Sequence, residues 1–391
     1  MTGRARPLCI GICAPYDLGR EGGVNSHIRA QATALRRLGH SVVIFGASSA
    51  PLGDGEIAIG GSLSIVIGGT ATGFGLDPRA RRQVIDLFRA HRFDVVHVHE
   101  PLMPLVPWLA VRHSPAPIVA TFHVHREQGH VWYPKFKWLL APLMRRVDAR
   151  LAVSAAARRT VAHTFPGEYD IVPNGIDVAR FQLPAARPRE MGGDVPSVLF
   201  VGRLEPRKGV GRLIQAMTIV QRRVPNARLM IVGDGPDRAA LEAAARDAQV
   251  TATFTGRVAD EALPAFYRAA DLVCSPALGG ESFGIVLLEA MAAGRPIVAT
   301  RIEGYEELLS GAECARLVTA GDSEALADAI ATLLGDAGAR RTLGANGEAF
   351  VRDYDWALVA RRLESIYVAL VSQAGLKGPP YIGERDAVQP M

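Results

Sequence analysis

Residues 198–209 read VLFVGRLEPRKG, an apolar run that ends in a glycine and a basic loop. The same order of features opens the chain, where residues 8–16 read LCIGICAPY and Gly22-Gly23 precedes helical spacing over 24–38. An uninterrupted apolar run is typical of a strand buried on both faces, as in a parallel sheet. We therefore expect a strand, a loop and a helix in both places.

Further apolar runs follow each of these two starts and alternate with helix-like stretches. The runs occupy residues 42–47, 95–98, 117–122 and 149–153, and then 228–233, 252–256, 271–276, 296–300 and 315–318. The helix-like stretches include residues 81–90, 136–146 and 155–163. This alternation predicts the α/β class, with two Rossmann-like, doubly wound parallel-sheet domains that face one another across a cleft. Ligands should bind beyond the carboxyl ends of the strands.

The expected domain limits follow from a change in composition. Residues 183–197 (LPAARPREMGGDVPS) are rich in Pro, Gly and charge and lack apolar periodicity, which indicates a linker. Residues 1–182 and 198–355 are then the N-terminal and C-terminal domains. Helical periodicity returns over 356–373, which we expect to pack back on the N-terminal domain, and the turn-rich residues 374–391 predict a loose tail.

Composition excludes several classes of protein. With 391 residues, 49% hydrophobic and 21% charged, the chain can bury two cores and is not a disordered, collagen-like or disulfide-scaffold protein. No run of about 18 uncharged apolar residues occurs, and the N-terminus leads straight into a strand-like run, so we expect neither a membrane span nor a signal peptide. The four cysteines are scattered, as core residues of a cytoplasmic protein would be.

The net charge of +5 is distributed unevenly. Residues 1–180 hold 21 Lys and Arg against 13 Asp and Glu, whereas the rest of the chain holds 23 against 26. Basic clusters beside apolar residues in the first part can lie on an anionic bilayer, although solvated helix faces explain them equally well. The clusters contain Arg79, Arg81, Arg82, Lys135 and Lys137. No nucleic-acid motif is present, so nucleic acid is not an expected partner.

Two loops have the composition of phosphate-binding sites. Gly22-Gly23 lies between the first strand and the first helix, where backbone N–H groups can approach an anion, but a tight turn explains it equally well. Arg203 and Lys208 flank the loop after residue 202, and together they can neutralise a diphosphate without a metal. A solvated basic turn is the alternative for this second loop.

The most specific feature is residues 279–290, GGESFGIVLLEA. A glycine loop carries Glu281 to the start of a helix, and Glu289 follows eight positions later, about two turns on and on nearly the same face. Glu281 would then lie near free N–H groups that bind phosphate, and Glu289 could reach a ribose. A helix-start Glu and an ordinary surface Glu are the alternative, but the helix between them is strongly apolar, which favours a functional role.

The histidines suggest a competing class. His97 and His99 share one predicted strand and His123 and His125 share the next, a spacing that can suit zinc in a hydrolase. That hypothesis leaves the basic loop and the spaced glutamates unexplained. A Ser-His-Asp hydrolase is weaker still, because no G-x-S-x-G motif occurs.

Taken together and in order, these motifs resemble those of retaining GT-B glycosyltransferases of the glycogen-synthase-like superfamily, glycosyltransferase family 4. The resemblance rests on Gly22-Gly23, Thr121-Phe122-His123, the loop 202–209 and the Glu281–Glu289 element, and it covers about residues 8–371. Within the superfamily the chain is most similar to the actinobacterial phosphatidylinositol mannosyltransferases. That likeness is carried by residues 22–27 (GGVNSH), 97–101 (HVHEP), 118–123 (IVATFH), 173–177 (PNGID) and 279–294.

The resemblance implies a role for each matched residue. His123, Glu281, Arg203 and Lys208 would form the catalytic set, in which Glu281 contacts the donor sugar and the two cations hold the diphosphate. Other donor contacts would be Gly23, Arg257, Val258, Phe283, Gly284, Ile285 and Glu289. Acceptor contacts would be Tyr16, Gly22, Asn25 and His123. The chain departs from the pattern at Asn25, where glutamine is usual, and at Val124-His125-Arg126, which replaces a hydroxyl-rich stretch.

The resemblance also implies the reaction. A hexose, mannose from GDP-mannose, would pass with retained configuration to a hydroxyl of a phosphatidylinositol-type lipid, by a front-face route that needs no metal or other cofactor. The enzyme would be cytoplasmic and peripheral on the inner face of the cell membrane. A UDP-sugar donor or a soluble polyol acceptor is the alternative within the same fold.

Overall fold

The computed structural model describes residues 6–20, 22–67, 70–75, 77–127, 129–193 and 195–377. They form two compact units. The first unit contains the residues up to Thr121, Phe136–Leu151 and the residues from Ala360 onward. The second unit contains Phe122–Lys135 and Ala152–Val359. The domain limits expected from the sequence stay a prediction, and their tail beyond residue 377 lies outside the described residues.

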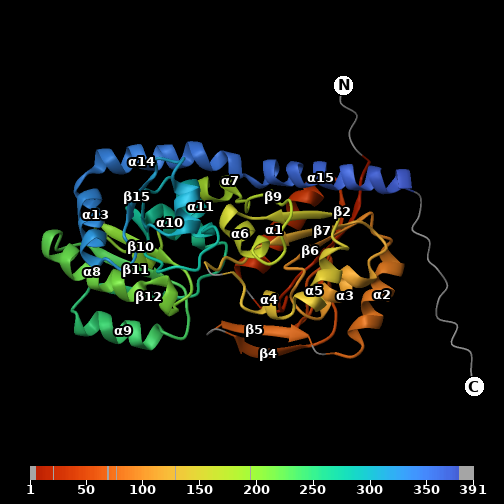
Figure 1. Cartoon of the computed structure of the whole chain (residues 1–391). Coiled ribbons are helices and arrows are strands. Elements are labelled where there is room, and N and C mark those ends of the chain that lie inside the picture. The colour runs from red at the N-terminus through yellow and green to blue at the C-terminus, as the bar shows by residue number, and fades with distance from the viewer. Residues whose placement is uncertain are drawn as a thin grey trace, which may run out of the picture. The chain divides into compact units, whose positions relative to one another are not determined.

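The described residues build two large sheets and one hairpin (Figure 1). The strand order of the seven-stranded sheet is β3 (Glu56–Ala58), β2 (Ser41–Gly46), β1 (Cys9–Cys13), β6 (Val95–His99), β7 (Ile118–Phe122), β8 (Ala149–Ala152) and β9 (Asp170–Ile171). The six-stranded sheet has the order β12 (Ala252–Gly256), β11 (Arg228–Val232), β10 (Ser197–Val201), β13 (Leu272–Ser275), β14 (Ile297–Thr300) and β15 (Ala315–Val318). The pairings are parallel from β3 to β7 and throughout the second sheet. The predicted α/β fold with two parallel sheets is confirmed.

The hairpin of β4 (Ser62–Ile67) and β5 (Thr70–Gly75) is a separate antiparallel sheet of two strands. The sequence-based predictions include no strand at these residues, although the pattern S-L-S-I-V-I is itself a strand signal.

The helices fall between the strands, as the alternation predicts. Before the second sheet they are α1 (Gly23–Arg37), α2 (Ala80–His91), α3 (Val106–His113), α4 (Trp132–Lys135), α5 (Lys137–Met144), α6 (Ala155–Ala162), α7 (Val178–Gln182) and η1 (Arg189–Met191). After β10 they are η2 (Pro206–Lys208), α8 (Val210–Arg223), α9 (Arg238–Asp247), α10 (Leu263–Ala269), α11 (Ile285–Ala292), α12 (Glu303–Leu309), α13 (Ser323–Gly335), α14 (Ala337–Phe350), η3 (Val351–Tyr354) and α15 (Trp356–Lys377). Within the described residues, no helix combines the length and the hydropathy that crossing a membrane requires.

Side chains alternate between the two faces of the six-stranded sheet. Val198 and Phe200 of β10 pack in one core cluster with α8, whereas Leu199 between them packs in another cluster with α11. Because successive side chains of a strand point to opposite faces, an all-apolar strand must be covered on both. Figure 1 shows α8 and α11 on opposite sides of these strands.

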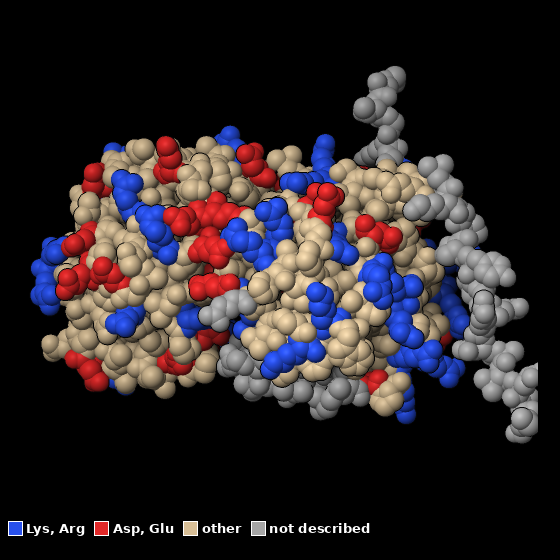
Figure 2. All heavy atoms as spheres, viewed as in Figure 1, with Lys and Arg blue, Asp and Glu red and all other residues tan. Residues whose placement is uncertain are grey.

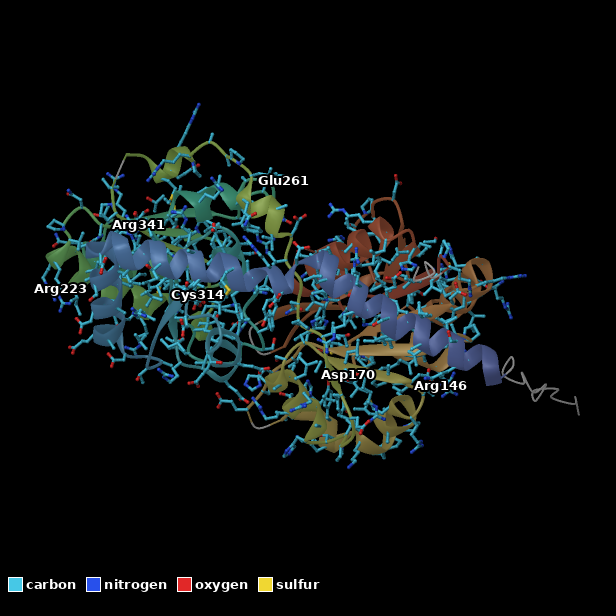
Figure 3. The ribbon with its side chains drawn as sticks, turned by 90° about the horizontal axis from the view of Figure 1, so that it is seen from above. Arg146, Asp170, Arg223, Glu261, Cys314 and Arg341 are labelled. Atoms are coloured by element: carbon cyan, nitrogen blue, oxygen red, sulfur yellow. The ribbon has the colours of Figure 1, made fainter. Side chains whose placement is uncertain are left out.

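Three of the four cysteines are core residues, as predicted. Cys13, Cys274 and Cys314 are buried, Cys9 is half-buried, and all four are free thiols. Figure 3 shows Cys314 beside α14, where a Cβ on Gly347 would lie 3.3 Å from the Cβ of Cys314. Burial raises the pKa of the Cys314 thiol to about 12, so the group is protonated at neutral pH.

The first unit contains a buried polar cluster next to its sheet. Tyr367 of α15 donates or accepts a 2.6 Å hydrogen bond with Nδ1 of His97, and Gln31 of α1 donates to the Tyr367 hydroxyl at 3.1 Å. The residues of α15 from Ala360 onward therefore pack on α1 and β6 within this unit.

Candidate active site

The candidate site of the second unit begins where two neighbouring strands end. Residues 202–209 follow β10 and residues 276–284 follow β13, the strand that pairs with β10. The amide of Leu278 donates to the carbonyl of Arg207 at 2.7 Å. Gly209 has φ +71, and a Cβ there would lie 1.9 Å from the Pro276 carbonyl oxygen. The two loops thus pack backbone against backbone, which only glycine permits at position 209.

This packing brings Glu281 into contact with two cations. Nζ of Lys208 lies 2.9 Å from Oε1 of Glu281, and Arg207 also pairs with that oxygen. The Lys208 and Glu281 side chains are only 15% and 11% exposed. Ion pairs that are shielded from water are less screened than pairs on the surface.

Arg203 joins the same network through Glu205. Nε of Arg203 lies 3.7 Å from Glu205 Oε2, and a nitrogen of Arg207 lies 2.6 Å from Glu205 Oε1. Arg203, Lys208 and Glu281 therefore lie together, at the carboxyl edge of the sheet. We do not predict roles for Arg207 and Glu205 from the sequence, although both stand inside the basic loop 202–209.

The second carboxylate of the element is held by a tyrosine. Glu289 lies on α11, which begins at Ile285 behind Gly284, a left-handed residue with φ +86. The Tyr267 hydroxyl donates a 2.6 Å hydrogen bond to Glu289 Oε2. Burial raises the pKa of Glu289 to about 7, although the Tyr267 hydrogen bond and Arg180 act in the opposite direction. Phe283 and Gly284 are buried in the turn before the helix.

The predicted base-contacting residues lie two strands away from β10 at the same edge. Arg257 and Val258 directly follow β12, and the order β12-β11-β10 places them in line with the basic loop. Arg257 is exposed, and Val258 packs partly against the core.

Four predicted ligand contacts belong to the first unit. Gly22 and Gly23 lead into α1, and among the described residues no atom lies within 4 Å of a Cβ placed at either position. Asn25 is 3% exposed and donates to the carbonyls of Asp17 at 2.8 Å and Arg20 at 2.9 Å. Both of its amide hydrogens hold the loop after β1. Tyr16 lies in that loop and is half-buried.

The histidines of the zinc hypothesis have protein partners. His97 is 1% exposed, and its ring nitrogens contact the Tyr367 hydroxyl at 2.6 Å and Thr121 Oγ1 at 2.7 Å. Burial lowers the pKa of His97 to about 3. In the second unit, His125 Nε2 lies 3.2 Å from Glu303 Oε2 and its Nδ1 lies 3.3 Å from the Ala156 carbonyl. His97 and His125 are thus engaged at both nitrogens, which leaves the four-histidine set incomplete.

His123, the remaining catalytic candidate, lies in the second unit directly after β7. It is 8% exposed. The same unit therefore contains His123, Arg203, Lys208, Glu281 and Glu289.

Comparison with known proteins shows the family of the chain. Residues 21–180 match the family described as Glycosyltransferase Family 4, and residues 187–350 match Glycosyl transferases group 1. The chain is 36% identical over 374 residues to the phosphatidyl-myo-inositol mannosyltransferase of Mycolicibacterium smegmatis, which covers 94% of this chain and 95% of the relative. It is 31% identical over 374 residues to the same enzyme of Propionibacterium freudenreichii, with 92% and 94% covered.

Solved structures show the same fold. Sucrose-phosphate synthase from Thermosynechococcus elongatus superposes with a TM-score of 0.73 at 23% identity, covering 94% of this chain and 100% of that one. WaaG, a glycosyltransferase of lipopolysaccharide biosynthesis, gives 0.69 at 20% identity, covering 92% and 99%. The protein is thus a glycosyltransferase of the GT-B class. The chain belongs to glycosyltransferase family 4, the family indicated by its motifs.

Proposed function

We propose that this enzyme transfers mannose from GDP-mannose to a hydroxyl of a phosphatidylinositol-type lipid, with retention of configuration and without a metal. The observation that carries the proposal is the joint position of Lys208, Arg203 and Glu281 at the edge where the parallel strands end. The identity of 36% with a phosphatidyl-myo-inositol mannosyltransferase supports the choice of donor sugar and acceptor.

The leaving diphosphate is the group that the loop 202–209 would stabilise. Charge develops on the diphosphate as the glycosidic bond breaks, so fixed cations lower the barrier more than they tighten substrate binding. Lys208 would act as a point charge and Arg203 as a planar fork. A bound diphosphate would also draw Lys208 and Arg207 away from Glu281, which frees that carboxylate to accept hydrogen bonds from the sugar hydroxyls.

The remaining residues would orient the two substrates. Glu289, fixed by Tyr267, would accept a hydrogen bond from the ribose, and Arg257 with Val258 would lie beside the base. His123 would polarise and orient the transferred sugar. In the front-face route, a donor phosphate oxygen takes the proton of the acceptor hydroxyl, so no protein nucleophile is required.

A lipid acceptor would bring the enzyme to a membrane surface. In the first unit, α2 contacts α3, and α3 contacts α5. Figure 2 shows Lys and Arg side chains over this region. Trp138 at the start of α5 is 75% exposed, and Phe136 just before the helix is 40% exposed. Basic and aromatic side chains on one surface favour an anionic bilayer interface. We propose a cytoplasmic enzyme that binds peripherally to the membrane through this surface.

A matrix of nucleotide sugars against acceptors tests the proposal. GDP-mannose, GDP-glucose, UDP-glucose and UDP-N-acetylglucosamine would each be incubated with phosphatidylinositol vesicles or free inositol, in the presence of a chelator. We expect a mannosylated lipid only with GDP-mannose and phosphatidylinositol, read as GDP release and product mass. A UDP-sugar product would support the alternative donor, and product with free inositol alone would support the soluble acceptor.

A further inference from the structure

Helix α12 is short, yet it carries three glutamates with different surroundings, Glu303, Glu306 and Glu307. Glu306 pairs with Arg301 at 2.7 Å, and both side chains are about half exposed (48% and 54%). Glu303 and Glu307, four positions apart and on one helix face, contact a segment more than 140 residues earlier in the chain.

Glu307 contacts the start of α6. Its Oε1 accepts from the amide of Ala155 at 2.7 Å, and its Oε2 accepts from the amide of Ala156 at 3.2 Å. Both amides belong to the first turn of α6, whose N–H groups have no partner inside the helix. A carboxylate at this position is favoured by the helix dipole as well as by the hydrogen bonds.

Glu303 contacts the loop that carries His123. Its Oε2 lies 3.2 Å from Nε2 of His125, a side chain that is only 3% exposed, and its other oxygen pairs with Arg159 of α6. His125 is fixed from its other side by the Ala156 carbonyl at 3.3 Å. His125 stands two residues after His123, so Glu303 fixes the backbone next to the predicted catalytic histidine.

The same turn of α12 is packed against the loop of Glu281. A Cβ on Gly304 would lie 2.1 Å from the Glu281 carbonyl oxygen, which shows how closely the two backbones approach. Tyr305 is fully buried, and its hydroxyl lies 2.8 Å from Oγ of Ser275 at the end of β13. A Cβ on Gly284 would lie 2.7 Å from the Tyr305 ring. Neighbouring residues of α12 thus contact both the loop of Glu281 and the segment of His123 and His125.

We infer that α12 is a positioning element, and that Glu303 and Glu307 are positioning residues that fix the His123 segment relative to the Glu281 loop. The inference rests on the proposed function, since it assigns both segments to one reaction. Neither glutamate contacts the reacting atoms. Their effect on turnover arises because a misplacement of about 1 Å between reacting groups can cost roughly a hundredfold in rate.

The test compares Glu303→Ala/Glu307→Ala with Glu306→Ala, a matched control on the same helix. We expect the double variant to lose at least tenfold in kcat for mannosyl transfer while its affinity for GDP stays within twofold. Amide hydrogen exchange should become faster at residues 123–127 and 279–284. Glu306→Ala should behave as the unmodified enzyme in all three measurements.

Two further variants keep the inference falsifiable if the double variant does not fold. Glu303→Gln keeps the side-chain volume, and Glu307→Gln keeps one acceptor oxygen for α6, so each should give a smaller loss in the same direction. A double variant with kcat within twofold of Glu306→Ala would overturn the inference, as would unchanged exchange in both segments. If the unmodified enzyme transfers no sugar, the proposed function fails, while the exchange experiment still decides the role of α12.

Discussion

Lys208 is the single side chain on which we expect donor recognition to depend most. It is 15% exposed and its ammonium group lies 2.9 Å from Glu281, so the free site already holds a cation where the diphosphate should bind. Charge-assisted hydrogen bonds to phosphate are about twice as strong as neutral ones. The β-phosphate of GDP, which GMP lacks, is the group expected to contact this cation.

Lys208→Ala should therefore weaken GDP binding by roughly 10- to 100-fold, while GMP binding changes little. Isothermal titration calorimetry with both nucleotides measures the difference. Arg212→Ala, an exposed residue of α8 that contacts Gln215, is the matched control. An equal loss for GDP and GMP would show that Lys208 does not recognise the β-phosphate.

Glu289 gives a stability prediction that depends on pH. Its pKa is raised from 4.5 to about 7 by burial, so its ionisation opposes folding. This cost is absent below pH 4.5, grows between pH 4.5 and 7, and is complete above pH 7. Glu289→Gln, which cannot ionise and keeps an acceptor for Tyr267, should avoid it.

We expect Glu289→Gln to be more stable than the unmodified enzyme by about 1–3 kcal/mol at pH 8, with the difference falling toward zero near pH 4.5. Thermal unfolding followed by circular dichroism across this pH range measures it. A difference that stays constant with pH would mean that Glu289 does not titrate with a raised pKa.

At the scale of elements, the contact between the loops after β10 and β13 holds the site together. Gly209 has φ +71, and a Cβ there would lie 1.9 Å from the carbonyl oxygen of Pro276. Gly211 lies two residues later, inside α8. A Cβ on Gly211 would lie no closer than 3.9 Å to any neighbouring atom of the described residues. Replacing each glycine by alanine should therefore change the stability of the protein in opposite directions.

Gly209→Ala should destabilise the protein by about 1–3 kcal/mol, because it is strained in φ and collides with the Pro276 carbonyl. Gly211→Ala should be neutral or stabilise by about 0.4–1 kcal/mol, since it lowers the entropy of the unfolded chain without a clash. Midpoints of urea unfolding compare the two. Equal effects would show that the loop contact is not tight.

The elements themselves follow from the sequence where the apolar pattern is strong. The helix expected over 24–38 forms as Gly23–Arg37, and the one expected over 155–163 forms as Ala155–Ala162. The stretch 136–146 forms α5 over Lys137–Met144, while the single turn α4 before it is unpredicted because four residues are too few for a period.

At the scale of the whole molecule, the convergence of Arg203, Lys208 and Glu281 could be predicted because neighbouring parallel strands end at one edge of a sheet. The roles of Arg207, Glu205 and α12 could not. The roles of Arg207 and α12 depend on contacts between segments more than 70 residues apart, such as Arg207 with Glu281, whose register only the folded backbone sets. Glu205 joins the site through its ion pair with Arg207, which no motif indicates. Asn25 illustrates a different limit, since its amide nitrogen donates to two nearby carbonyls, those of Asp17 and Arg20, that no motif indicates.

Membrane binding is the prediction that concerns the whole enzyme. Vesicles of phosphatidylinositol and phosphatidylglycerol should co-sediment with it at low salt and release it as salt rises, because screening weakens each basic contact. Replacing Arg79, Arg81 and Arg82 by Ala should weaken binding by roughly 10- to 100-fold.

Replacing Arg222 and Arg223 of α8 by Ala removes charge from the second unit and should leave vesicle binding unchanged. Binding to neutral phosphatidylcholine vesicles that matches binding to anionic ones would contradict an electrostatic surface in the first unit.

Turnover of the double variant Arg203→Ala/Lys208→Ala shows whether the two cations stabilise the leaving diphosphate. GDP release from GDP-mannose in the presence of phosphatidylinositol vesicles would be measured for this variant and for Arg212→Ala. We expect turnover to fall at least a hundredfold in the double variant and to stay near that of the unmodified enzyme in Arg212→Ala. Full turnover in a folded double variant would contradict the claim that these cations stabilise the leaving diphosphate.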